Sequence, residues 1–380
     1  MFGNQLVYLL FTHSQHEVGR LAEGSGALTY RSGAEAPATI ERTYVLNRSK
    51  LMGLVLGLVA AIALAVPALA SATLNGAGST LVAPLLSNWK TGFEAGGGTA
   101  ISYNPVGSGE GIKQIVARTV DFGASDAPMT PEQAGECGGC VTIPWALSAT
   151  GVGFNIPGVN KLNLSGPVLA EIYLGKIKKW NDPKIAKLNP KAKLPGLSIT
   201  PIYRSDGSGD TYAFSNYLSK VSPAFRSQVG VGTTVGFKAG VGAKGNSGVT
   251  ADLKTEGAIA YVAVAYLIGA GAHAAAIENA AGSFALPNLK NIEEAATVVK
   301  KARPNSAVSI VDPPKAAKKA YPISTFTYAI VPNGAPQATA LKEFIGYAIS
   351  TKGQEYGAAL DFAPLPPVVL AAAQKAVESL

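Results

Sequence analysis

The chain has 380 residues, of which 47% are hydrophobic and 15% are charged, and its formal net charge is +8. This length and apolar content exclude a disulfide-stapled miniprotein and a disordered tail, and predict about one to three domains. The 32 basic residues include no run of five, so nucleic-acid binding is not expected.

The first predicted element is an export signal. Residues 51–66 are uncharged and apolar, follow two basic residues and lead into a run of small residues, which is the order of a secretory signal peptide. Cleavage is expected after Ala70 or Ala72, with an uncleaved membrane anchor as the alternative. Residues 1–44 are long and mixed in charge for an n-region, so we expect that they are not translated and that 45–72 is the signal peptide. The mature protein is then expected to be soluble and periplasmic.

After this signal region, 1–72, short apolar runs alternate with amphipathic ones, which is typical of an α/β protein. Leu81, Leu85, Trp89 and Phe93 recur at four-residue spacing and predict a helix with one buried stripe. Further helices are predicted over 166–174 and 292–301, and the Gly-rich segment 230–248 is predicted to be a loop. Strands are predicted at 100–103, 120–123, 151–155, 199–203, 258–264 and 325–331.

Three Gly- and Ser-containing turns open directly into predicted helices, at 76–86, 107–117 and 205–218. Such turns allow a ligand to approach the backbone and leave the first helical N–H groups without intrahelical partners. A single turn of this kind is most often an ordinary N-cap. Three in one chain, one of them just after Arg204, predict convergence on a single anion, because a guanidinium and helix N-termini both suit oxyanions.

A carboxylate, Asp126, follows the predicted strand 120–123. Hydrogen phosphate has a proton to donate to Asp126, whereas sulfate at neutral pH has none. Close like charges then disfavour sulfate by an energy on the order of 4 kcal/mol, roughly a thousandfold in affinity. The alternative role for Asp126 is a turn cap before Pro128. Asp206 is expected to orient the guanidinium of Arg204, with an ordinary turn residue as its alternative.

The chain's two cysteines, Cys137 and Cys140, are the candidate disulfide, and a redox C-x-x-C motif is the alternative. A zinc site would need a second pair of ligands, and beyond the signal region the chain has no other Cys and one His, His273. We therefore expect no metal and no cofactor. The sequence also lacks a nucleotide P-loop and a G-x-S-x-G motif, so no enzyme is expected.

From about Leu74 onward the chain resembles the periplasmic phosphate-binding proteins of bacterial phosphate ABC transporters. The resemblance rests on eight segments in order: GAGST, VGSGEGIKQ, VDFGASDAP, EIYLGKIKKWNDPKIAKLNP, RSDGSG, KGNSGV, YPISTFTY and LDFAPLP. It implies a type II periplasmic-binding-protein fold, with two lobes of mixed β-sheets flanked by helices and joined by hinge strands. Lobe I would comprise 73–150 with 325–380, and lobe II 151–324.

The resemblance also implies a set of phosphate-binding residues. These are Thr80, Leu81, Ser108, Asp126, Arg204, Ser208, Gly209 and Asp210, with hydroxyl groups, backbone N–H groups, one cation and one carboxylate acceptor among them. The family more commonly has Thr after Gly209, where this chain has Asp210 followed by Thr211. Either Asp210 lends only its backbone N–H while its carboxylate turns away, or Thr211 takes the place of the usual Thr.

The implied function is high-affinity capture of inorganic phosphate between the two lobes, which close by a hinge motion. The implied partners are the transmembrane permease subunits of a phosphate ABC transporter, to which the protein delivers phosphate as a monomer. Two alternatives stay open. One is a binding protein for another oxyanion, such as sulfate or molybdate, and the other is a secreted phosphatase or phosphate-linked adhesin on the same fold.

Overall fold

The structure, a computed structural model, describes residues 73–380, and the predicted signal region lies outside them. Its strands are β1 (Leu74–Gly78), β2 (Ile101–Asn104), β3 (Phe122–Ser125), β4 (Val141–Phe154), β5 (Asn163–Leu164), β6 (Thr200–Arg204), β7 (Val241–Ala243), β8 (Ala258–Ala263), β9 (His273–Ala274), β10 (Ala276–Glu278), β11 (Phe284–Ala285) and β12 (Ser324–Val331). Its helices are α2 (Ala83–Ala95), α3 (Ser108–Val116), α4 (Pro131–Glu136), α5 (Gly166–Tyr173), α6 (Pro183–Leu188), α7 (Gly209–Val221), α8 (Pro223–Gln228), α9 (Gly245–Asp252), α10 (Val264–Ala270), α11 (Leu289–Ala296), α12 (Ala338–Ile349), α13 (Thr351–Glu355), the 3₁₀ helix η1 (Ala358–Leu360) and α14 (Pro367–Glu378).

The predicted α/β class is confirmed, and the predicted strands and helices correspond to β2, β3, β4, β6, β8, β12, α2, α5 and α11. The prediction that 230–248 is entirely loop is wrong, because β7 and the start of α9 lie within it. β7 has no apolar alternation to reveal it. It exists because its backbone pairs with β6 along a parallel register from Ile202 to Arg204.

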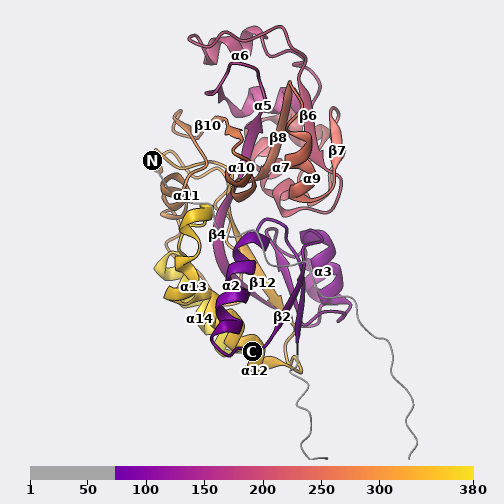
Figure 1. Ribbon diagram of the computed structural model, residues 1–380, viewed down its shortest axis with the longest axis vertical. Helices are drawn as coiled ribbons and strands as arrows, with labels where there is room; N and C mark the ends of the chain where they lie inside the picture. Colours follow the sequence, from indigo (N-terminus) through magenta and orange to yellow (C-terminus); the bar gives the residue numbers. More distant parts are fainter. Residues whose placement is uncertain (1–72) are drawn as a thin grey trace, which may run out of the picture. The chain divides into compact units, whose positions relative to one another are not determined.

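The main sheet has nine strands, and β4 passes through both halves of it (Figure 1). In the first half β2, β1 and β3 are parallel, and β12 runs antiparallel between β3 and β4. In the second half β8 runs antiparallel to β4, and β6 and β7 are parallel to β8. β4 pairs with β12 from Val141 to Ala149 and with β8 from Thr150 to Phe154. We call each half with its helices a lobe, the first containing β1 and the second containing β6.

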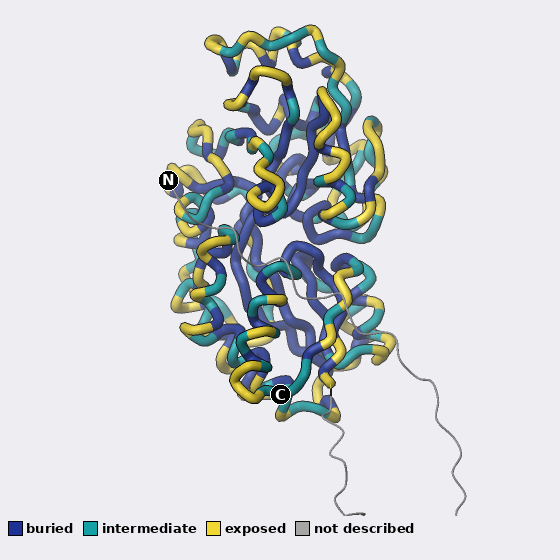
Figure 2. The backbone as a smooth tube through the Cα atoms, in the orientation of Figure 1, coloured by how far each residue is buried: buried dark blue, intermediate teal, exposed yellow. Residues whose placement is uncertain are grey.

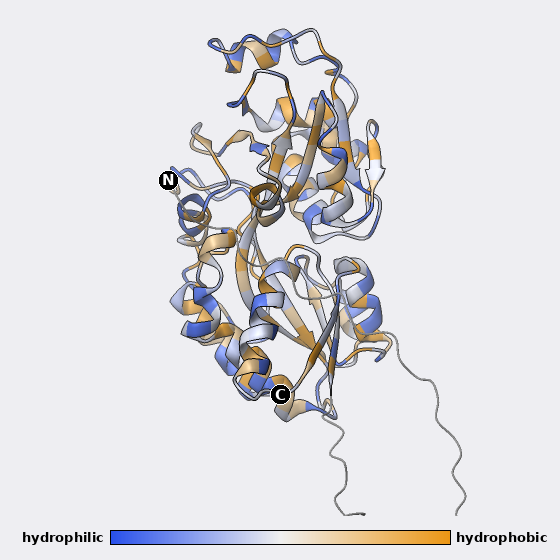
Figure 3. Cartoon of the chain, viewed as in Figure 1, coloured by the Kyte–Doolittle hydropathy of each residue, from blue (hydrophilic) through white to orange (hydrophobic). Residues whose placement is uncertain are grey.

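Each lobe has its own aromatic core beneath its helices. In the first lobe Phe122 of β3 and Trp145 of β4 pack against Phe344 of α12, and Trp89 of α2 packs against Trp145. In the second lobe the contacting rings are Tyr173, Phe214, Phe237 and Tyr261. Burying one such side chain contributes about 1.5–3 kcal/mol. Buried residues accordingly lie along the strands, and exposed residues lie in the outer loops (Figure 2). Hydrophobic residues are concentrated in the sheet (Figure 3).

The C-terminal segment packs on the first lobe. The indole N–H of Trp89 donates to the backbone oxygen of Gly353 at 2.8 Å, and the N–H of Ala363 donates to the backbone oxygen of Leu147 at 2.8 Å. Helix α14 also contacts β4. Both ends of the described residues therefore belong to the first lobe, and β4 and β12 connect the two lobes. None of the helices in this part of the chain combines the length and apolar character needed to span a bilayer.

Candidate functional site

The three predicted turns lie at the carboxyl ends of β1, β2 and β6, the edge of an α/β sheet at which ligands usually bind. The first turn leads from β1 into α2, the second from β2 into α3, and the third from β6 into α7. Gly107 begins the second helix with a φ of 96°, a left-handed value that glycine adopts without strain. The turns touch across the lobes, because the N–H of Gly109 donates to the backbone oxygen of Gly207 at 2.9 Å.

Asp126 lies between the first two turns and is 2% exposed. The hydroxyl of Ser79 donates to both of its carboxylate oxygens, at 2.6 and 2.7 Å, and the hydroxyl of Ser108 donates to Oδ2 at 3.2 Å. The backbone N–H of Asp126 donates to the Ser108 hydroxyl in return, at 3.1 Å. Ser79 is a site residue that the sequence reasoning missed, although it stands in the first turn beside Thr80.

Arg204 is 4% exposed, and each of its guanidinium nitrogens meets a carboxylate. Its Nε donates to Oδ1 of Asp206 at 2.7 Å, and its Nη2 donates to Oδ2 of the same residue. Its Nη1 donates to Oδ2 of Asp210 at 3.2 Å. Asp206 also accepts the N–H of Gly245 at 2.9 Å. Asp206 therefore contacts two of the three guanidinium nitrogens and fixes the plane of the group.

The carboxylate of Asp210 turns into the site, which differs from the alternative in which it turns away. Asp210 is 0% exposed. Its Oδ1 accepts from the hydroxyl of Thr150 at 2.7 Å, and its Oδ2 accepts from Nδ2 of Asn246 at 2.8 Å as well as from Arg204. Thr211, the other alternative, has its hydroxyl paired with that of Tyr261 at 2.7 Å. The nearby guanidinium and two neutral donors account for the inward orientation of Asp210.

Asn246, which the sequence reasoning also missed, connects the two lobes. Its Nδ2 donates to the hydroxyl of Thr80 in the first lobe at 2.9 Å and to Asp210 in the second. Its Oδ1 accepts the backbone N–H of Ala263 at 3.0 Å, which fixes the amide orientation. The only sequence signal was the segment KGNSGV, in which Asn246 lies near the start of α9.

Several buried backbone N–H groups at these turns have no acceptor among the described residues. They belong to Leu81, Ser108, Gly209 and Asp210. The first, second and fourth of these residues are at most 1% exposed, and Gly209 is also buried. Within 73–380 their amides donate no hydrogen bond. Buried amides in proteins are almost always paired. An anion enclosed here would accept from all of them, with three helix N-termini directed at it.

The site combines excess negative charge with deep burial. Burial raises the pKa of Asp126 to about 7, with the charge of Asp210 as a second cause, while hydrogen bonds from Ser79, Thr327 and Ser108 act in the opposite direction. Burial also raises the pKa of Asp210, although the charge of Arg204 opposes it. Burial would raise the pKa of Asp206 as well, but its hydrogen bond and ion pair with Arg204 lower it. Burial therefore favours the protonated form of both Asp126 and Asp210.

Cys137 and Cys140 lie away from these groups, on the apolar side of α3. The structure joins them in a disulfide, and their cluster includes Ile112 and Ile115 of that helix. The guanidinium of Arg118 contacts Sγ of Cys140 at 3.2 Å and donates to the backbone oxygen of Cys137 at 2.6 Å. No group of three or more His, Cys, Asp or Glu side chains within 73–380 is arranged to hold a metal ion.

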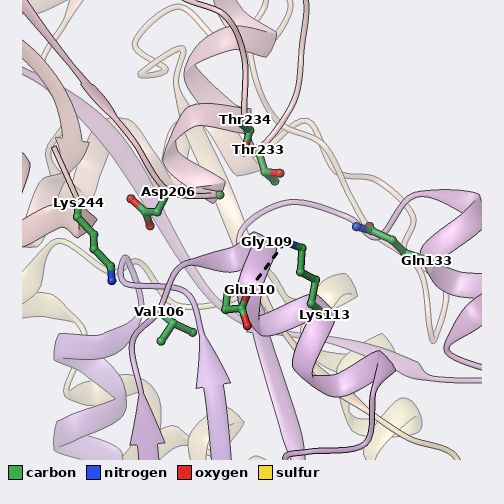
Figure 4. A pocket seen from close by; sticks show the side chains of 10 residues that line it. Val106, Gly109, Glu110, Lys113, Gln133, Asp206, Thr233, Thr234 and Lys244 are labelled. Atoms are coloured by element: carbon green, nitrogen blue, oxygen red, sulfur yellow. Dashed lines mark ion pairs between the residues drawn. The ribbon is translucent and has the colours of Figure 1, made fainter. Parts of the chain in front are cut away.

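A cavity of about 440 Å³ lies at the mouth of the cleft between the lobes (Figure 4). It borders the site through Asp206 but does not include Asp126 or Asp210, which are enclosed deeper between the lobes. Figure 4 shows the ion pair of Lys113 with Glu110 on the α3 side. The other lining residues are Val106, Gly109, Gln133, Gly207, Thr233, Thr234 and Lys244.

Known proteins are similar to this chain over most of its length. The family model described as PBP superfamily domain matches residues 65–352. The phosphate-binding protein PstS of Xylella fastidiosa (strain Temecula1) is 37% identical over 303 residues, which cover 78% of this chain and 82% of the relative. The protein of the same name from Pasteurella multocida is 38% identical over 306 residues, which cover 78% and 88%.

Solved structures share the fold at lower identity. The phosphate-binding protein of Stenotrophomonas maltophilia is 19% identical with a TM-score of 0.59, over 80% of this chain and 93% of that one. The high-affinity periplasmic phosphate-binding protein PfluDING, bound with phosphate, is 22% identical with a TM-score of 0.65, over the same shares of the two chains.

Proposed function

The chain belongs to the PBP superfamily domain family, alongside the phosphate-binding proteins PstS, and on that premise we propose that it captures inorganic phosphate between its two lobes. It acts as a binding protein and not as an enzyme. The observation that carries the proposal is the meeting of three helix starts, whose buried amides lack acceptors among the described residues, with one guanidinium and one protonatable carboxylate.

The phosphate oxygens accept from the backbone N–H groups of Leu81, Ser108, Gly209 and Asp210. Hydroxyl groups add to these donors: Thr80 extends from the first lobe, and Ser208 lies at the start of α7. The hydroxyl of Ser108 joins them when its one proton turns from Asp126 to the anion. Arg204 supplies the positive charge, and Asp206 keeps it in place. Asp126 accepts the phosphate proton, which disfavours sulfate because sulfate has no proton to give.

Closure of the lobes places these groups around the anion. In this proposal lobe I comprises 73–150 with 325–380, and lobe II comprises 151–324. The hinge is formed by β4 near residue 150 and by the start of β12, where β4 changes its partner from β12 to β8. The contacts from Gly109 to Gly207 and from Asn246 to Thr80 stabilise the closed form, and phosphate shifts the population toward it.

The setting proposed for this activity is the periplasm, after removal of the export signal. The closed, phosphate-loaded monomer docks on the membrane-embedded permease subunits of a phosphate ABC transporter and releases its ligand there. Support for this setting comes from the resemblance of the eight sequence segments to the periplasmic phosphate-binding proteins of ABC transporters and from the apolar segment that precedes the described residues.

Titration calorimetry of the purified protein against phosphate, sulfate and molybdate tests the proposal. We expect submicromolar binding of phosphate and at least about a hundredfold weaker binding of sulfate, as the charge argument requires. Equal competition by sulfate would make the protein a general oxyanion receptor. Release of phosphate from a phosphomonoester by the metal-free protein would instead support a phosphatase.

A further inference from the structure

Two buried carboxylates, rather than one, face the proposed anion position. Asp126 and Asp210 are 2% and 0% exposed, and they come from opposite lobes. The residue before Asp210, Gly209, lies so close to Asp126 that a Cβ atom at this glycine would be 2.4 Å from Oδ2 of the carboxylate. The single guanidinium is shared, because Arg204 donates two of its nitrogens to Asp206 and the third to Asp210. Two of the site's three carboxyl groups, those of Asp206 and Asp210, therefore pair with one cation.

Each of the two carboxylates has acceptor capacity left. Two hydroxyl groups donate to Asp126, those of Ser79 and Ser108. Asp210 accepts one bond on Oδ1, from Thr150, and two on Oδ2. A carboxylate has about four lone-pair positions, so both groups retain a position for a proton donated by a ligand.

Resting on the proposed phosphate binding, we propose that Asp210 makes this site select doubly protonated phosphate, H₂PO₄⁻, with one ligand proton donated to Asp126 and the other to Asp210. The dianion HPO₄²⁻ has one proton, so it would leave one buried carboxylate facing a phosphate oxygen. That arrangement sets two like charges together at a place where Arg204 is already neutralised by Asp206.

Arg204 is the cation that acts most strongly on Asp210. The titratable groups facing Asp126 are Asp210 on α7, Tyr103 on β2 and Tyr328 on β12, and both tyrosines have pKa values raised by burial. Those facing Asp210 are Arg204, Asp206, Asp126, and two tyrosines whose pKa values are also raised by burial, Tyr261 on β8 and Tyr266 on α10. All four tyrosines therefore stay neutral at the pH of the experiment below, and the proton balance belongs to the carboxyl groups and the ligand.

The number of protons taken up when phosphate binds tests this inference. At about pH 8.5 free phosphate carries mainly one proton, the pKa of Asp126 is raised only to about 7 and Asp210 is paired with Arg204, whereas the proposed complex contains two protons donated by the ligand. Binding must then take up about one proton per phosphate, and the affinity must fall about tenfold for each pH unit between about 8 and 9. With one carboxyl acceptor in place of two, the complex contains one proton and the uptake disappears.

The experiment is phosphate titration calorimetry at about pH 8.5 in buffers with different ionisation enthalpies, whose slope counts the protons taken up. We expect about one proton for the unmodified protein and about none for Asp210→Asn or Asp210→Thr, with a flat affinity profile in both variants. Glu110→Gln, which removes a carboxylate at the cleft mouth that does not contact Arg204, should retain the full uptake.

Three outcomes distinguish this inference about Asp210 from the proposed phosphate binding. Phosphate binding by the unmodified protein without proton uptake would overturn this inference and leave the proposed function standing. Tighter binding by Asp210→Asn with unchanged uptake would also overturn it, because Asp210 would then be a competitor of phosphate for Arg204. Absence of phosphate binding by the unmodified protein at every pH would instead refute the proposed function.

Discussion

The substitution Gly209→Ala should impair closure of the two lobes without affecting the folding of either lobe. A Cβ at this position would lie 2.4 Å from both Cβ and Oδ2 of Asp126, and 2.7 Å from Oγ of Ser108. Ordinary contact needs about 3.4 Å, so the lobes must separate locally by about 1 Å, the difference between 3.4 and 2.4. Because the clash is with the opposite lobe, opening the cleft relieves it without disturbing either core.

The expected effect follows from the contacts that this separation weakens. It lengthens the cross-lobe hydrogen bond from Gly109 to Gly207 and displaces the amides of Leu81 and Ser108 from the anion. Losing two or three such bonds is worth about 2–4 kcal/mol, which weakens phosphate binding roughly 30- to 1,000-fold. The free energy of unfolding without phosphate should change by less than about 1 kcal/mol, because Gly209 has no left-handed φ that alanine would disfavour.

Calorimetry measures the affinity for phosphate. Thermal unfolding with and without phosphate measures how much bound phosphate adds to the free energy of unfolding. For the unmodified protein, phosphate at 100 times its Kd should add about 2.7 kcal/mol to the free energy of unfolding, and the variant should lose most of that at the same concentration. The matched control is Gly248→Ala, whose Cβ would meet Ala243 at an ordinary 3.7 Å. Phosphate affinity of Gly209→Ala within about threefold of the unmodified protein would refute the close approach of α7 to Asp126.

Further predictions concern the carboxylate, the contact of Asn246 with Thr80 and the disulfide. Asp126→Asn should reduce the preference for phosphate over sulfate more than it reduces phosphate affinity, and competition titrations with both anions would detect unchanged relative affinities. Burial raises the pKa of Asp126 from 3.8 to about 7 in the folded state, so the protonated form stabilises the fold. The free energy of unfolding without phosphate should therefore fall by at most about 4 kcal/mol as pH rises from about 4 to 7, and denaturant titrations of Asp126→Asn should lack this slope. Asn246→Ala should weaken phosphate binding by about tenfold or more in calorimetry, because Asp210 and Thr80 lose a shared donor. Replacing Cys137 and Cys140 with Ser should lower the free energy of unfolding by about 2 kcal/mol while phosphate affinity measured by calorimetry stays the same.

Much of the fold was predictable because its signals are local. The stripe formed by Leu85, Trp89 and Phe93 follows helical periodicity and is buried in α2. The apolar run of β8 is buried on both faces, so it reads as a continuous hydrophobic segment. By contrast, β7 depends on pairing with β6, and no pattern in its own three residues could reveal it.

The turn residues at the site were predictable for a similar reason. Gly and Ser before a helix have conformational and capping preferences that act within a few residues, as Ser208 does when its hydroxyl accepts the N–H of Thr211. Asp206 is only two residues from Arg204, so their ion pair is nearly a local property.

The amino-acid sequence alone was sufficient to indicate the α/β class, the three turns that open into helices and the pair formed by Arg204 and Asp206, because short-range geometry governs each of them. Tertiary structure decided the direction of the Asp210 carboxylate and the roles of Ser79 and Asn246. Their partners are distant in the chain: Asn246 reaches Thr80 across 166 positions, and Ser79 reaches Asp126 across 47. Contacts of that kind depend on how the two lobes meet, and no local preference encodes them.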